Sequence, residues 1–297
     1  MKLLVTGASG LYGSKLTQIA AGKYHQVFSA HNKNPAPYGL PLQLDITNKT
    51  QIETAFEKAN PDVVFHAATL TDVDACELNP KLATKINVKG TYDIAQASRA
   101  NNAFLIYIST DYVFDGKKGC YTETDQPLPI NHYGYTKLKA EEYVKEISDQ
   151  YCIVRTSVIY GATPAVGKTN FALWILDKLR KGEQVKVFTD QWNSPTLNTS
   201  LAKMTLEIME KRLTGIYHLS GASRISRYNF AFLLAKTFKL DTKLLIPILS
   251  RELSFAAKRP RDSSLNTTKA KEALRNRPLR IDAALKKFKS ELKSSPN

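Results

Sequence analysis

Cysteine is scarce in this chain of 297 residues, and the three cysteines are far apart. Cys76, Cys120 and Cys152 form no Cys-x-x-Cys pair, so the sequence offers neither a disulfide framework nor a zinc-ligand arrangement. The five histidines show no metal-ligand spacing either. We therefore expect no structural metal.

Long hydrophobic runs are also lacking. No apolar run approaches the roughly 18 residues that cross a bilayer. The apolar segment near the N-terminus ends at Thr6 and Gly7, which is too short for the core of a signal peptide and is typical of a buried strand. Hydrophobic residues still make up 43% of the chain, enough for a sizeable core. We expect a globular, cytoplasmic protein without a membrane partner.

Acidic residues are few in the second half of the chain. Residues 1–150 carry 15 Lys and Arg against 16 Asp and Glu, whereas residues 151–297 carry 27 against 11. The excess indicates a polyanionic partner, such as nucleic acid, an acidic membrane surface or a phosphorylated small substrate, or else only a solvated basic surface. Nucleic acid is the weakest of these, because no aromatic-interleaved basic strand or recognition-helix motif accompanies the charge. We expect no nucleic-acid partner.

Short apolar segments alternate with helical patterns through the first half. Strands that are apolar on both faces are typical of a parallel sheet covered by helices on both sides. The predicted strands are 2–5, 26–30, 62–67, 104–109 and 152–158, and the predicted helices are 12–22, 49–59, 81–101 and 135–149. Further helices are predicted at 170–181, 199–212, 227–238 and 281–292.

This alternation predicts an α/β fold with a Rossmann-type doubly wound parallel sheet. We expect the dinucleotide-binding domain over residues 1–160, completed by a strand near 215–220. Residues 161–297 are expected to form mainly a smaller, interleaved α/β substrate-binding lobe. Ligands of such sheets bind beyond the carboxyl ends of the strands, so chemistry is expected directly after each strand.

A glycine-rich turn follows the first predicted strand. Gly7, Gly10 and Gly13 lie where that strand gives way to a helix. Glycine permits a tight turn and close backbone approach, and the N-terminus of the helix can bind a pyrophosphate. The position of the turn predicts dinucleotide binding, with a tight turn that binds nothing as the alternative.

The end of the second predicted strand lacks an acidic residue. Enzymes specific for NAD usually place Asp or Glu there to bind the ribose 2′-hydroxyl. This chain has His31, Asn32 and Lys33, and Lys33 and His31 are able to meet a 2′-phosphate. The pattern favours NADPH, with NADH as the alternative.

Two Tyr-x-x-x-Lys pairs overlap on one predicted helix, Tyr133 with Lys137 and Tyr135 with Lys139. The pairs point to nearly opposite sides, because residues two apart are separated by about 200° on a helix. Tyr133 and Lys137 share the apolar face, so we expect this pair to reach a site. A nearby ammonium lowers the pKa of a phenol from its usual value of about 10, so acid–base chemistry by the tyrosine needs the lysine. The alternative is an aromatic core contact beside a lysine.

Polar residues close the strand that precedes this helix. Thr110 and Asp111 place a hydroxyl and a carboxylate at the ligand edge of the predicted sheet. A hydroxyl there can hydrogen-bond a substrate oxygen beside the tyrosine. Thr110, Tyr133 and Lys137 then form a constellation for proton transfer in a carbonyl–alcohol redox step.

These motifs resemble those of the extended short-chain dehydrogenases/reductases and, within that group, the dTDP-4-dehydrorhamnose reductase family. The specific segments are ISTDYVFDG at residues 108–116 and YGYTKL at residues 133–138. Supporting segments lie at residues 44–46, 67–74, 190–196 and 259–263. The resemblance covers nearly the whole chain.

The resemblance implies an enzyme that uses NADPH to reduce the 4-keto group of a nucleotide-linked 6-deoxy sugar, most simply dTDP-4-dehydro-L-rhamnose to dTDP-L-rhamnose. It implies that Tyr133 donates the proton and that Lys137 holds the nicotinamide ribose. It also implies cofactor contacts at the phosphates by Gly10, Leu11 and Tyr12, at the adenine by Asp45 and Ile46, and toward the nicotinamide by Ala67, Ala68 and Thr69. Expected substrate contacts are Thr110, Asp111 and Tyr133, with Arg259 as a candidate for the diphosphate.

Two departures from related patterns bear on the activity. Related dehydratases have a glutamate where this chain has Tyr112, which argues against elimination. The bacterial reductases have a tryptophan where this chain has Val158, which leaves the identity of the sugar open. Two other functions stay open as well: an NADP-binding regulatory subunit resembling the methionine adenosyltransferase β subunit, and a nucleotide-sugar 4-epimerase. The resemblance also leaves a homodimer open as the assembly.

Overall fold

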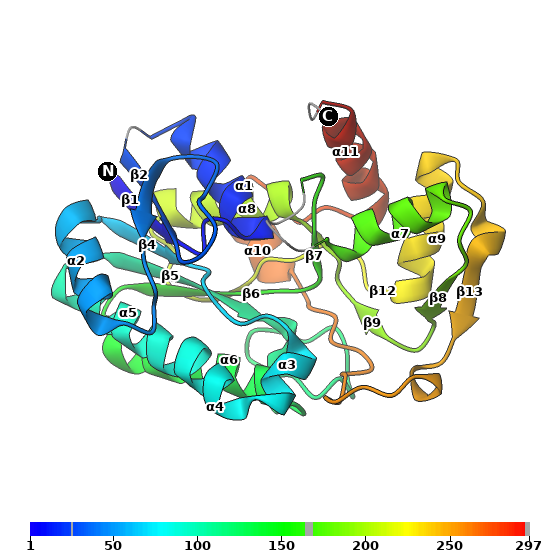
Figure 1. Ribbon diagram of the computed structural model, residues 1–297, viewed down its shortest axis with the longest axis horizontal. Helices are drawn as coiled ribbons and strands as arrows, with labels where there is room; N and C mark the ends of the chain where they lie inside the picture. The colour runs from blue at the N-terminus through cyan, green and yellow to red at the C-terminus, as the bar shows by residue number, and fades with distance from the viewer. Residues whose placement is uncertain (25, 164–168, 295–297) are drawn as a thin grey trace.

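Seven parallel strands form the central sheet of the computed structural model, which describes residues 1–24, 26–163 and 169–294 (Figure 1). Their order is β11-β6-β5-β4-β1-β2-β3, and each neighbouring pair is parallel. The strands are β1 (Lys2–Thr6), β2 (Gln26–His31), β3 (Leu40–Gln43), β4 (Val63–His66), β5 (Phe104–Thr110), β6 (Tyr151–Thr156) and β11 (Gly215–His218). The predicted doubly wound sheet is confirmed, and β3 is a strand that the sequence analysis missed.

Helices cover both faces of this sheet because its strands are apolar on both sides. On one face α1 (Leu11–Ala21), α8 (Asn198–Glu210) and α10 (Thr268–Ala273) contribute Leu16, Leu201 and Ala270 to a shared core. On the other face α2 (Lys49–Ala59), α5 (Gly90–Ala100) and α6 (His132–Ile147) surround Leu4, Val64 and Leu105. The helix predicted at 81–101 consists of α4 (Pro80–Ala83), a π-helical turn η1 (Thr84–Lys89) and α5, and it follows α3 (Val73–Leu78).

A second, smaller lobe lies beside the sheet (Figure 1). Its helices are α7 (Phe171–Arg180), α9 (Arg227–Phe238) and α11 (Ile281–Ser294). Its strand pairs are β8 (Val185–Phe188) with β13 (Leu245–Ile248), β9 (Trp192–Asn193) with β12 (Ile225–Ser226), and β7 (Ile159–Tyr160) with β10 (Thr196–Leu197). The buried ring of Tyr160 packs edge-on against Phe230 and Phe288 and so ties β7 to α9 and α11.

The chain crosses between the two lobes more than once. After β10 it returns to the sheet as α8 and β11, and it returns again as α10 after passing through the second lobe. The segment before α10 runs beside the end of β5, where the backbone N–H of Asp262 donates to the carbonyl of Gly116 at 3.0 Å. The lobes are therefore interleaved in sequence, as the fold prediction required.

Three short 3-10 turns complete the described structure: η2 (Asp111–Val113), η3 (Thr242–Leu244) and η4 (Ser250–Glu252). Across residues 1–24, 26–163 and 169–294, no helix is both long and apolar enough to cross a membrane. The same residues contain no group of three or more His, Cys, Asp or Glu side chains that could hold a metal ion.

Candidate active site

A cavity of about 960 Å³ opens at the carboxyl ends of the central strands. Thr6, Ala67, Thr110 and Thr156 line it at or just beyond the ends of β1, β4, β5 and β6. Arg227 and Phe171, the first residues of α9 and α7, line it from the second lobe. A cleft of this size between two lobes is large enough for a dinucleotide and a substrate side by side.

Nearly every site residue expected from the sequence lines this one cavity. The residues expected around the cofactor that line it are Gly7, Gly10, Leu11, Tyr12, Gly13, His31, Asn32, Lys33, Asp45, Ile46, Ala67, Ala68 and Thr69. Thr110, Asp111, Tyr133 and Lys137 line it as well, whereas Arg259 does not. The positions agree with the expected roles, and the roles themselves stay predictions.

The glycine turn brings backbone to backbone at the start of α1. Gly7 has φ +66°, and a Cβ there would lie 2.7 Å from the amide nitrogen of Ala68. A Cβ at Gly13 would lie 2.2 Å from the carbonyl oxygen of Gly7. Gly10 is the N-cap of α1 and offers no side-chain cap, so free backbone N–H groups of the first turn remain for an anion. This geometry fits the pyrophosphate of a dinucleotide.

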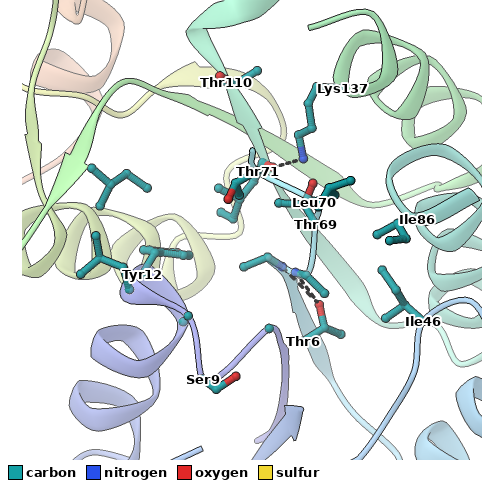
Figure 2. Close-up of a pocket in the computed structure, with 18 of the residues that line it drawn as sticks. Thr6, Ser9, Tyr12, Ile46, Thr69, Leu70, Thr71, Ile86, Thr110 and Lys137 are labelled. Carbon is teal, nitrogen blue, oxygen red and sulfur yellow. Dashed lines mark hydrogen bonds between the residues drawn. The ribbon is translucent and has the colours of Figure 1, made fainter. Parts of the chain in front are cut away.

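A buried hydrogen-bond chain fixes the cavity wall after β4. Thr6 Oγ1 accepts from the amide nitrogens of Ala67 and Ala68, both at 3.2 Å (Figure 2). Its hydroxyl therefore donates to Nδ1 of His66 at 2.7 Å, and Nε2 of His66 donates to Thr91 at 3.0 Å. Burial lowers the pKa of His66 to about 3, which keeps the ring neutral. Ala67 and Ala68 are held in place without a charge.

Asp45 and Ile46, the residues expected around the adenine, also line the cavity. Ile46 and Ile86 lie on the same side of the pocket in Figure 2. The backbone N–H of Thr47 donates to the Asp45 carboxylate at 2.8 Å and holds the pKa of that carboxyl below its usual value. Lys33 and Lys85 line the same region and are exposed, so two cations are available to an anionic group there.

The helix α6 places Tyr133 and Lys137 toward the cavity and Tyr135 away from it. Asn131 caps α6 by accepting from the amide nitrogen of Gly134 at 2.8 Å. A Cβ at Gly134 would lie 2.1 Å from the carbonyl oxygen of Tyr112, so the first turn of α6 sits directly against the end of β5. Lys137 is 2% exposed, whereas Tyr135 is 45% exposed. Tyr133 and Lys137 line the cavity, as the choice between the two overlapping pairs expected, and their roles stay predictions.

The expected lowering of the Tyr133 pKa by Lys137 was wrong for this structure. Lys137 Nζ donates to the carbonyl oxygen of Ile108 at 2.7 Å (Figure 2) and lies 4.2 Å from the ring centroid of Tyr107. Burial raises the pKa of Tyr133, and the hydrogen bond with Thr110 opposes that rise. Burial also lowers the pKa of Lys137 to about 7. Desolvation is the largest cause of the pKa shift in both groups.

The Asp111 carboxylate lines the cavity but is engaged by hydrogen bonds from three neighbouring hydroxyl groups. Its carboxylate accepts from Thr110 Oγ1 at 3.2 Å, from Ser157 Oγ at 2.8 Å and from Ser263 Oγ at 2.5 Å. Burial raises its pKa, and these hydroxyls oppose that rise. Asp111 thus joins the end of β5 to two other segments and orients the hydroxyl of Thr110.

Arg259 is bound elsewhere. Its Nη2 donates to Oδ2 of Asp74 in α3 at 2.7 Å, and Oδ1 of Asp74 accepts from the amide nitrogen of Ala257 at 2.9 Å. The expected diphosphate contact of Arg259 finds no support in this position. The two residues are 185 positions apart in the sequence, so no local sequence pattern predicts their pairing.

The sequence analysis missed one residue that lines the cavity, Arg227, and one that holds its lining in place, Asn87. Asn87 in the π-helical turn accepts from Thr69 Oγ1 at 2.8 Å and from the amide nitrogen of Leu70 at 2.7 Å, which fixes the segment after β4. A π-turn inside a helix is often found at a functional site, but sequence periodicity does not reveal one. Arg227 was also missed, because it follows a short strand of the second lobe that was not predicted.

We compared the chain with protein families and with known proteins. The model of the RmlD substrate binding domain matches residues 1–294. The chain belongs to this family. A dTDP-4-dehydrorhamnose reductase from Aggregatibacter actinomycetemcomitans is 31% identical over 97% of this chain and 98% of its own. The probable low-salt glycan biosynthesis reductase Agl14 of Haloferax volcanii is 32% identical over 90% of both chains.

Solved structures of this family share the whole fold. A hypothetical dTDP-4-dehydrorhamnose reductase from Sulfolobus tokodaii has a TM-score of 0.84 at 36% identity, covering 93% of this chain and 95% of that one. The enzyme from Bacillus anthracis, solved in complex with NADP, has a TM-score of 0.86 at 32% identity and covers 98% and 100%. The chain is also similar to a relative of another kind: methionine adenosyltransferase 2 subunit beta of Pongo abelii is 30% identical over 90% of this chain and 81% of its own.

Proposed function

We propose that this family member is an NADPH-dependent reductase of the 4-keto group of a nucleotide-linked 6-deoxy sugar, most simply dTDP-4-dehydro-L-rhamnose. The observation that carries the proposal is the meeting of Tyr133, Thr110 and Lys137 in the cavity that the glycine turn also lines. A reductase named for this substrate is 31% identical over nearly the full chain, and a structure with NADP shares the fold. NADH is the alternative cofactor.

The residues present fit a bound dinucleotide. The uncapped first turn of α1 would hold the pyrophosphate, Asp45 and Ile46 the adenine, and Lys33 with His31 a 2′-phosphate. The nicotinamide supplies the hydride that is transferred to C4 of the sugar. Lys137 would hold the adjoining ribose through hydroxyl groups that compete with the carbonyl of Ile108 for its Nζ.

Proton transfer completes the reduction. Tyr133 gives its phenolic proton to O4 of the sugar as the carbonyl becomes an alkoxide, so one hydride and one proton convert the ketone to an alcohol. The raised pKa of Tyr133 keeps the phenol protonated before the step. Thr110 donates its hydroxyl proton to Asp111 and accepts a hydrogen bond from Tyr133, which orients the phenol.

The matched pair of tyrosines on α6 gives a direct test. Purified protein is mixed with NADPH and enzymatically generated dTDP-4-dehydro-L-rhamnose, and the NADPH absorbance is followed. Tyr133→Phe should lose about 10²- to 10⁴-fold in kcat, the range for removal of a general acid. Tyr135→Phe, on the exposed side of the same helix, should keep the activity of the natural protein.

A regulatory subunit is the second candidate, because relatives named methionine adenosyltransferase 2 subunit beta cover 90% of the chain. NADPH that binds without being consumed would contradict the reductase and favour this candidate. An epimerase would instead retain NAD through purification and interconvert C4 epimers without net consumption. Each outcome therefore selects one function.

A further inference from the structure

A single arginine stands on the second-lobe side of the cavity. Among the lining residues that the structure describes, the cations are Lys33, Lys85, Lys137 and Arg227. Lys137 is bound to the Ile108 carbonyl, and Lys85 lies close enough to the Asp45 carboxylate to lower its pKa. Arg227 is the one of these four cations that comes from the second lobe, at the start of α9.

Arg227 is held in a fixed orientation. Its Nε donates to Oε1 of Gln191 at 3.2 Å, and its backbone N–H donates to the carbonyl of the same residue at 3.0 Å. Its guanidinium carbon lies 5.2 Å from the ring centroid of Phe171. The Gln191 amide is buried, and its Nε2 has no partner among the described residues. Burying Nε2 of Gln191 without a partner costs free energy, and the same amide accepts from Arg227 through its oxygen. This cost indicates that the orientation of the Arg227 guanidinium is important.

These contacts use Nε and one face of the guanidinium, and the Arg227 side chain also hydrogen-bonds Tyr112, so the terminal N–H groups that these partners do not use are available to a ligand. Arg227 forms no ion pair within residues 1–24, 26–163 and 169–294. Arg259, by contrast, donates a hydrogen bond from Nη2 to Asp74 and lies outside the cavity lining. The planar fork of an arginine is suited to two phosphate oxygens at once.

The position of Arg227 matches the geometry of a sugar nucleotide. The Tyr112 and Tyr133 rings pack edge-on with centroids 6.0 Å apart. Arg227 is near enough to Tyr112 for its charge to oppose the rise in the Tyr112 pKa that burial causes. Tyr112 therefore contacts both Arg227 and the proposed proton donor, and all three residues line the same cavity. In a nucleotide-linked hexose, C4 and the anomeric carbon that carries the diphosphate lie at opposite ends of one sugar ring.

We propose that Arg227, aimed by Gln191 and Phe171, binds the diphosphate of the nucleotide-linked substrate. This inference rests on the proposed function, since it takes the substrate to be a sugar joined to a nucleoside diphosphate. It assigns to Arg227 the task that the sequence suggested for Arg259. Because the anchor is remote from the reacting carbon, it sets substrate affinity and places C4 beside Tyr133.

The test compares Arg227→Gln and Arg227→Lys with a neighbouring control. Arg224→Gln removes an arginine that pairs with Asp262 at 2.6 Å, stacks over Trp192 and lies outside the cavity lining. Calorimetry with thymidine 5′-diphosphate gives Kd, and steady-state kinetics give KM for each substrate. Arg227→Gln should weaken thymidine 5′-diphosphate binding and raise KM for the nucleotide sugar by about 10- to 100-fold, the range for a hydrogen bond to a charged group.

The control measurements separate this inference from the proposed function. The KM for NADPH should stay unchanged in all three variants, and Arg224→Gln should match the natural protein throughout. Arg227→Lys should recover part of the affinity, because it keeps the charge but not the fork. If the natural protein turns over the sugar nucleotide and Arg227→Gln binds thymidine 5′-diphosphate as tightly, the Arg227 inference is overturned and the reductase stands. If the natural protein binds no thymidine 5′-diphosphate and shows no turnover, both are overturned.

Discussion

The buried Lys137 side chain should lower the free energy of unfolding near neutral pH. Its side chain is 2% exposed, and burial lowers its pKa from the usual 10.5 to about 7. In the unfolded chain the same group keeps its proton up to about pH 10.5. Below the folded pKa, the protein therefore carries the cost of a buried ammonium that the unfolded chain does not carry.

The pH dependence of this cost can be worked out from the two pKa values. Between about pH 7 and pH 10.5 the unfolded chain binds the extra proton, so the contribution of Lys137 to the free energy of unfolding rises with pH. From about pH 6.5 to pH 9.5 the rise is about 3 kcal/mol. Lys137→Met removes the titrating group and also leaves the Ile108 carbonyl unpaired, which costs about 1–3 kcal/mol at every pH.

Urea unfolding at the two pH values measures the difference. The free energy of unfolding of Lys137→Met relative to the natural protein should fall by about 3 kcal/mol from about pH 6.5 to pH 9.5. Lys139→Met, which removes an exposed lysine of the same helix, should show no such trend. A Lys137→Met difference that is the same at both pH values would refute the argument that burial sets the protonation of this lysine.

Two further substitutions test the cofactor turn and a buried ion pair. Gly13→Ala places a Cβ against the carbonyl of Gly7 and should weaken NADPH binding by about tenfold or more in a fluorescence titration, and an unchanged Kd would contradict this. Glu141→Gln disrupts the fully buried pair with Arg155 and should lower the free energy of unfolding by about 3–5 kcal/mol. The exposed Glu142→Gln should change it by less than about 1 kcal/mol, and equal effects would show that burial is not the cause.

Local sequence patterns were sufficient for the parts of the fold that repeat. Apolar runs predict the strands 26–30 and 104–109, and helical periodicity predicts the helix at 49–59. The spacing of the glycines predicts the position of the glycine turn. The strand β3 was missed because its four residues include Pro41 and only Leu42 is buried. The two-residue strands of the second lobe carry too few side chains to form a pattern.

Long-range pairing explains what the sequence could not provide at the site. Tyr133, Lys137 and Thr110 follow from spacing on one helix and one strand, and the structure brings them to one cavity. Arg259 and Arg227 have similar side chains, and only the tertiary contacts with Asp74 and Gln191 distinguish their surroundings. The pKa of Tyr133 was also misjudged, because burial is a property of the folded chain.

The central claim is that the protein transfers a hydride to C4 of a nucleotide-linked sugar. The most direct measurement uses NADPH that carries deuterium at the transferred position of the nicotinamide, with dTDP-4-dehydro-L-rhamnose as the acceptor. Mass and NMR analysis of the sugar product should find one deuterium at C4 for each NADPH consumed. A sugar without deuterium at C4, recovered after incubation with protein that binds NADPH, would contradict the account.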